Sequence, residues 1–89
     1  MVHFSNVIKN KIEYEIVKRC GRINGVRKVN AWLKITWKNG SYFIEGDVDV
    51  KGLTNLNSIQ KSVEKEISNI LKEYIPNGYH SRITVCTTK

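Results

Sequence analysis

Residues 29–50 read VNAWLKITWKNGSYFIEGDVDV, and this stretch decides the fold. Apolar and polar side chains alternate on both sides of Asn39-Gly40, a pair typical of a two-residue hairpin turn with positive φ at both positions. Such a turn fixes the strand register. On one face it pairs Lys34 with Glu45 and Trp32 with Asp47. The predicted pairs on the apolar face are Trp37–Tyr42, Ile35–Ile44, Leu33–Gly46, Ala31–Val48 and Val29–Val50. The two strands are expected over residues 26–38 and 41–50, with Trp37 in the core.

A helix is predicted before the hairpin, over residues 6–20. Ser5 is its expected N-cap, and Gly21 follows the last periodic residue. Its apolar stripe comprises Ile8, Ile12, Ile16, Val17 and Cys20.

A second helix is predicted after the hairpin, over residues 55–75, with Thr54 as its cap. Its apolar stripe comprises Leu56, Ile59, Val63, Ile67, Ile70, Leu71 and Tyr74. Pro76-Asn77-Gly78 ends it. Alternation then returns, which predicts a strand over residues 82–87.

The element order α-β-β-α-β predicts one domain over residues 1–89, an α/β (α+β) two-layer sandwich. A three-stranded mixed sheet should carry both helices on one face, with the last strand parallel to a neighbour because a helix precedes it. The other sheet face stays uncovered, and a bare face with two aromatic residues in a small domain is a candidate interface. This face is expected to present Asn30, Trp32, Lys34, Phe43, Glu45, Asp47, Arg82, Thr84 and Cys86.

The composition of the chain limits the classes of function that it can have. The 89 residues carry a net charge of +7, with 40% hydrophobic and 26% charged residues, which is globular composition. No apolar run is long enough to span a bilayer and no secretory signal is visible, so we expect an intracellular chain with Cys20 and Cys86 as reduced thiols. No catalytic or phosphate-binding motif occurs, so no enzymatic activity is predicted.

Two charge clusters have alternative interpretations. Glu45, Asp47 and Asp49 share one strand face, where they form either a cation site or a solvated acidic surface. A basic run can contact phosphate, either of nucleic acid or of lipid, or can simply be a solvated helix end. That run consists of Lys18, Arg19, Arg22, Arg27 and Lys28.

The order of elements and three sequence stretches resemble the cytosolic C-terminal domain of cation diffusion facilitator (cation efflux) transporters. The stretches are Gly25–Val29, Gly40–Val50 and Ile83–Cys86, with the helix Leu56–Leu71 and Ile75-Pro76 between the last two. The resemblance covers most of residues 12–87. It implies a metallochaperone-like fold, a homodimer and a regulatory role in divalent-cation efflux, tethered to the cytoplasmic side of the membrane by the transporter's transmembrane part.

The resemblance also implies sites. Family histidines are replaced here by Asn30, Asp47, Asn57 and Cys86, and we take Asp47, Cys86 and Asn30 as candidate ligands. The implied ion is zinc, with manganese, iron or cobalt as alternatives, and no cofactor is expected to be required for folding. Strand alternation places the three ligands on the uncovered face, where Trp32, Phe43 and Thr84 are the predicted dimer contacts.

Two other functions are open. The basic run and the exposed aromatic residues are compatible with a small nucleic-acid-binding module, whose binding should weaken steeply with salt. The helix-hairpin-helix-strand order also resembles the alkaline-shock-protein family, which implies an intracellular assembly protein.

Overall fold

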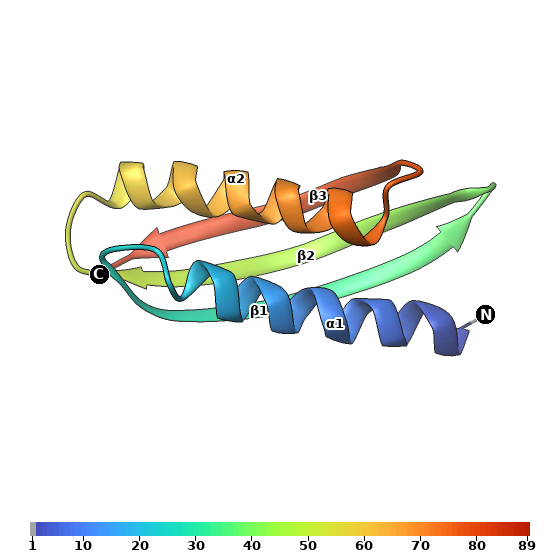
Figure 1. Ribbon diagram of the computed structural model, residues 1–89, viewed down its shortest axis with the longest axis horizontal. Coiled ribbons are helices and arrows are strands. Elements are labelled where there is room, and N and C mark those ends of the chain that lie inside the picture. Colours follow the sequence, from blue (N-terminus) through green and yellow to red (C-terminus); the bar gives the residue numbers. More distant parts are fainter. Residues whose placement is uncertain (1) are drawn as a thin grey trace.

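The computed structural model describes residues 2–89, with side chains from Asn6 onward. The elements are α1 (Val2–Cys20), β1 (Val26–Lys38), β2 (Ser41–Gly52), α2 (Leu56–Tyr74) and β3 (Tyr79–Thr88). Both helices lie side by side on one face of a single sheet (Figure 1). The predicted α-β-β-α-β two-layer sandwich is therefore confirmed, in a body of 41 × 19 × 18 Å. Within residues 2–89, none of the helices combines the length and apolar character needed to cross a membrane.

The sheet has the order β1-β2-β3, with β1 and β2 antiparallel and β2 and β3 parallel. The hairpin register is the one that the Asn39-Gly40 turn predicts, from Trp37 opposite Tyr42 to Val29 opposite Val50. Both turn residues have positive φ, 52° and 78°. The turn therefore sets the faces of the residues from Lys28 to Lys38 and from Ser41 to Lys51, and an irregularity shifts the register between Val26 and Lys28.

Several element ends differ from the prediction. The first helix begins at Val2, so Ser5 lies within it and is not its N-cap. The residue before α2 is Asn55 in a left-handed conformation, φ 54°, instead of Thr54. β3 begins at Tyr79, three residues before the expected start, because pairing with the long strand β2 extends the ladder beyond the alternating segment.

The core lies between the sheet and the two helices. Each helix contributes its predicted stripe, except that Val17 is exposed. Most fully buried are Ile12, Ile16, Cys20, Ile44, Val48, Val50, Val63 and Ile70. Burial of this continuous apolar cluster is the main stabilising contribution to the fold.

Trp37 does not belong to the core, because its side chain is 55% exposed. It has the predicted face, but the tip of the hairpin projects beyond the end of α2 (Figure 1). Its ring instead packs edge-on against Tyr42, with 4.7 Å between ring centroids.

Gly46 allows β1 and β2 to approach closely in the middle of the sheet. A Cβ atom at this position would lie 2.0 Å from the Trp32 carbonyl oxygen and 2.9 Å from Leu33 Cα. Only glycine fits this contact without moving the backbone. The close approach lies beneath the candidate site described next.

Candidate interaction site on the uncovered sheet face

The sheet face opposite the helices carries side chains in rows that cross all three strands. One row is Trp32–Asp47–Thr84 and the next is Lys34–Glu45–Arg82. The flanking rows are Thr36–Phe43–His80 and Asn30–Asp49–Cys86. We refer to these twelve residues as the outer face. They include every residue that the sequence analysis assigned to the uncovered surface.

The predicted dimer contacts lie close together on the outer face. Trp32 is 56% exposed, and Thr84 is exposed in the same row. Phe43 is only half-buried and stacks on His80, with ring centroids 4.7 Å apart and planes 16° apart. His80 is a contact that the sequence analysis missed, because β3 begins earlier than predicted. Trp32 is therefore the large apolar side chain of this face that lies uncovered.

A shallow hollow of about 460 Å³ lies beside Trp32. The backbone of Gly46 is part of its lining, whereas the side-chain position of this residue belongs to the opposite, helix-covered face with Leu33 and Ile83. Its lining consists of Trp32, Leu33, Lys34, Glu45, Gly46, Asp47, Arg82 and Thr84. The outer face thus offers both a protruding aromatic ring and an adjacent depression.

The acidic and the basic side chains of the outer face lie on different strands. The middle strand β2 presents the carboxylates of Glu45, Asp47 and Asp49, whereas β1 contributes Lys34 and β3 contributes Arg82. A negative stripe therefore runs between one basic residue on each of the two neighbouring strands. This arrangement is electrostatically complementary to a shifted copy of itself, and it disfavours a phosphate backbone lying along β2.

The three candidate metal ligands do not meet at one point. Asn30 and Cys86 belong to one row but lie on β1 and β3, about 10 Å apart because strands are spaced by about 4.8 Å. Asp49 lies between them, while Asp47 belongs to the neighbouring row. No group of three or more His, Cys, Asp and Glu residues that could hold a metal occurs in the described part of the chain. Asn30, Asp47 and Cys86 of one chain therefore do not converge on a tetrahedral zinc site.

The two cysteines lie in different environments. Cys20 is completely buried, and desolvation, assisted by the nearby charge of Glu66, raises its pKa to about 12. Cys86 is exposed on the outer face. Both are free thiols. Only Cys86 is placed to react or to bind a ligand.

The fold places the members of the predicted basic run in two environments: Arg19 is bound to glutamates, and the other four residues are exposed. The Arg19 guanidinium donates to both carboxylate oxygens of Glu73, at 2.6 and 2.8 Å, and to Glu15 at 2.8 Å. These bonds, first of all those to Glu73, raise the pKa of Arg19, and Arg19 also lowers the pKa of Glu73. Arg19 therefore joins α1 to α2 instead of facing a phosphate. The run's exposed members are Lys18, Arg22, Arg27 and Lys28.

Comparison with known proteins adds no family assignment. No protein-family model and no curated protein matches this chain.

Proposed function

We propose that this chain is a non-enzymatic dimerisation domain that acts on the cytoplasmic side of the membrane as the regulatory part of a divalent-cation efflux transporter. The observation that carries the proposal is the 56% exposure of Trp32 in the middle of an uncovered sheet face. Exposed aromatic side chains at the centre of such a surface are typical of interface anchors.

The charge stripes favour a second copy as the occupant of this face. If a two-fold axis runs between β1 and β2, the basic strand β1 of each copy lies over the acidic strand β2 of the other. Lys34 then faces Glu45 of the second copy, and each Trp32 approaches the hollow at Gly46 of the other copy. Such an interface is isologous and self-complementary.

The proposed cargo of the transporter is a divalent cation, and zinc is the first candidate. Asp47, Asp49 and Cys86 of one chain do not form a complete site, so an ion on the outer face would need donors from two copies. Calorimetric titration of the dimer with zinc, manganese and iron tests this point. Binding that survives in Asp47→Ala and in Cys86→Ser would exclude the outer face as the site.

Sedimentation equilibrium tests the dimerisation. Trp32→Glu introduces a charge into the proposed contact, and we expect the average mass to fall at least twofold relative to the wild type. Trp37→Glu is the matched control, because Trp37 is equally exposed but lies at the hairpin tip on the other side of the sheet. An unchanged mass for Trp32→Glu would overturn the proposal.

A nucleic-acid-binding module is the second candidate, supported by the exposed Arg22, Arg27 and Lys28 at one end of the molecule. The acidic stripe of β2 and the engagement of Arg19 weigh against it. The two candidates differ in salt dependence. Binding to an RNA oligonucleotide should weaken steeply between 50 and 200 mM salt, by roughly tenfold or more, if phosphate contacts carry it.

A further inference from the structure

The sheet has two edge strands, β1 and β3, and a side chain of α1 binds the backbone of β1 at one point. Along β1, helix α1 places the Glu13 carboxylate against the backbone, where it accepts a hydrogen bond from the Leu33 N–H at 2.7 Å. Along β3, the backbone groups that face away from β2 have no hydrogen-bond partner in residues 2–89. An open edge of ten residues is a template for one more strand.

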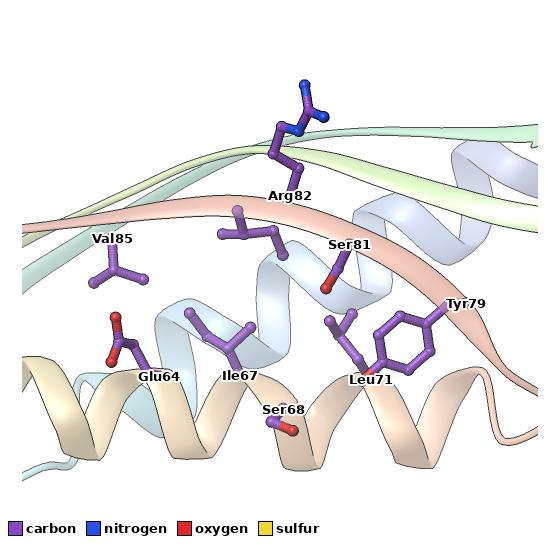
Figure 2. A pocket seen from close by; sticks show the side chains of 9 residues that line it. Glu64, Ile67, Ser68, Leu71, Tyr79, Ser81, Arg82 and Val85 are labelled. Atoms are coloured by element: carbon purple, nitrogen blue, oxygen red, sulfur yellow. The ribbon is translucent and has the colours of Figure 1, made fainter.

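A groove of about 290 Å³ follows this open edge. Figure 2 shows it between β3 and α2, with Ile67 and Leu71 of the helix opposite Tyr79 and Val85 of the strand, while Arg82 points to the other face. The inward residues Ile83 and Val85 are only partly buried, whereas Ile44, Val48 and Val50 of β2 are fully buried. Helix α2 therefore leaves room under its flank for the side chains of a fourth strand.

The apolar and the hydroxyl residues on the inward side of β3 are arranged symmetrically about Thr84. An antiparallel pairing of β3 with itself about this residue brings Ile83 opposite Val85 and Ser81 opposite Thr87 of the second copy. Apolar side chains meet in the groove and hydroxyl side chains meet at its ends, which are favourable cross-strand pairs. Arg82 faces Cys86 instead of another arginine, so no like charges oppose each other directly.

We propose that β3 pairs antiparallel with β3 of a second copy about Thr84, joining the two three-stranded sheets into one continuous sheet. Because this contact is isologous, each β3 edge is used up by one partner and the pairing ends at two copies. The contact is separate from the outer-face contact under the proposed function. A chain that uses both surfaces assembles beyond the dimer.

Site-specific cross-linking tests the register. In a Cys86→Ser background, Thr84→Cys places two thiols directly opposite each other across the two-fold axis, within disulfide range. We expect a covalent dimer under mild oxidation. Thr88→Cys in the same background is the control, because its two copies are about 27 Å apart in this register. Absence of the Thr84→Cys cross-link, or equal cross-linking at both positions, would overturn the proposal.

A second variant separates this contact from the outer-face contact. Val85→Lys points a charge into the groove, where a lone chain can extend it to solvent but a paired strand would bury it. Far-ultraviolet circular dichroism verifies folding, and Val85→Thr is the shape-matched control. We expect Val85→Lys to lower the sedimenting mass at least twofold, and Val85→Lys with Trp32→Glu to be monomeric. A wild-type mass for Val85→Lys would contradict the β3 contact alone, whereas a wild-type mass for Trp32→Glu would contradict only the outer-face contact.

Discussion

The Glu13 carboxylate of α1 accepts a hydrogen bond from the backbone N–H of Leu33 in β1, at 2.7 Å. A side chain thus replaces the strand that this backbone group would otherwise bind. Glu13 is also 3.7 Å from the Lys9 ammonium. One glutamate therefore attaches helix α1 to the sheet and occupies one outward-facing N–H of the β1 edge.

Loss of this acceptor should destabilise the protein. Glu13→Ala leaves a partly buried N–H without a partner, and we expect the free energy of unfolding to fall by about 1–3 kcal/mol. Glu13→Gln should lose less, because an amide carbonyl still accepts. Urea denaturation measures both. Lys9→Ala removes the partly exposed ion pair but keeps the Glu13 acceptor, and it should stay within about 0.5 kcal/mol of the wild type. An equal loss in Lys9→Ala and Glu13→Ala would contradict the assignment.

The Arg19–Glu73 pair should make stability depend on pH. The pKa of Glu73 lies below its ordinary value of 4.5, chiefly because Arg19 donates to its carboxylate. Its stabilising effect is therefore present above pH 4.5 and is lost as the pH falls through the folded-state pKa. Glu73→Gln should have a lower melting temperature than the wild type at pH 7, and the two should converge in acid.

Glu64→Gln is the control for that experiment. Glu64 is exposed on the same helix and has no ion pair in the described part of the chain. Its substitution should leave the difference between pH 7 and acid unchanged. A pH profile for Glu73→Gln that runs parallel to the wild type would show that the pair contributes nothing.

Gly46 and Gly40 require glycine for different reasons. At Gly46 the reason is a close backbone contact, and at Gly40 it is the positive φ. Gly46→Ala brings a Cβ atom to 2.0 Å from a backbone oxygen, so the strands must separate, and we expect a loss of about 3 kcal/mol or more. Gly40 has φ +78° but no atom within 4 Å, so Gly40→Ala should cost only about 1–2 kcal/mol. Thermal or urea denaturation ranks the two. A milder effect at Gly46 would contradict the close approach.

The sequence predicts the hairpin and its register because the Asn39-Gly40 turn and two alternating patterns agree, and it predicts the parallel third strand because a helix precedes that strand. It misplaces Trp37 and Val17, because alternation and periodicity assign a face but not how far other elements cover that face. The same limit applies to the site. Alternation places Asn30, Asp47 and Cys86 on one face, but only the register between β2 and β3 shows that Asp49 is the carboxylate beside Cys86.

The two cysteines should differ in reactivity. Burial raises the pKa of Cys20 to about 12, so its thiol stays protonated and shielded near neutral pH, whereas Cys86 is exposed. A thiol reagent such as dithionitrobenzoate should therefore modify one cysteine per native chain and both in denaturant. Native Cys86→Ser should react with none. Rapid modification of Cys20 in that variant would show that its region opens frequently.

Tryptophan fluorescence can follow the outer-face contact directly, because the two indoles are equally exposed but lie on different sides of the sheet. Trp37→Phe leaves Trp32 as the reporter, and Trp32→Phe leaves Trp37. Adding Val85→Lys to both keeps the β3 contact from contributing. If the outer face dimerises, Trp32 enters an apolar interface, and its emission should shift to shorter wavelength as the protein concentration rises. Trp37 emission should stay constant over the same range, because the hairpin tip remains in water. A shift of equal size at both residues would indicate general aggregation and contradict a specific contact at Trp32.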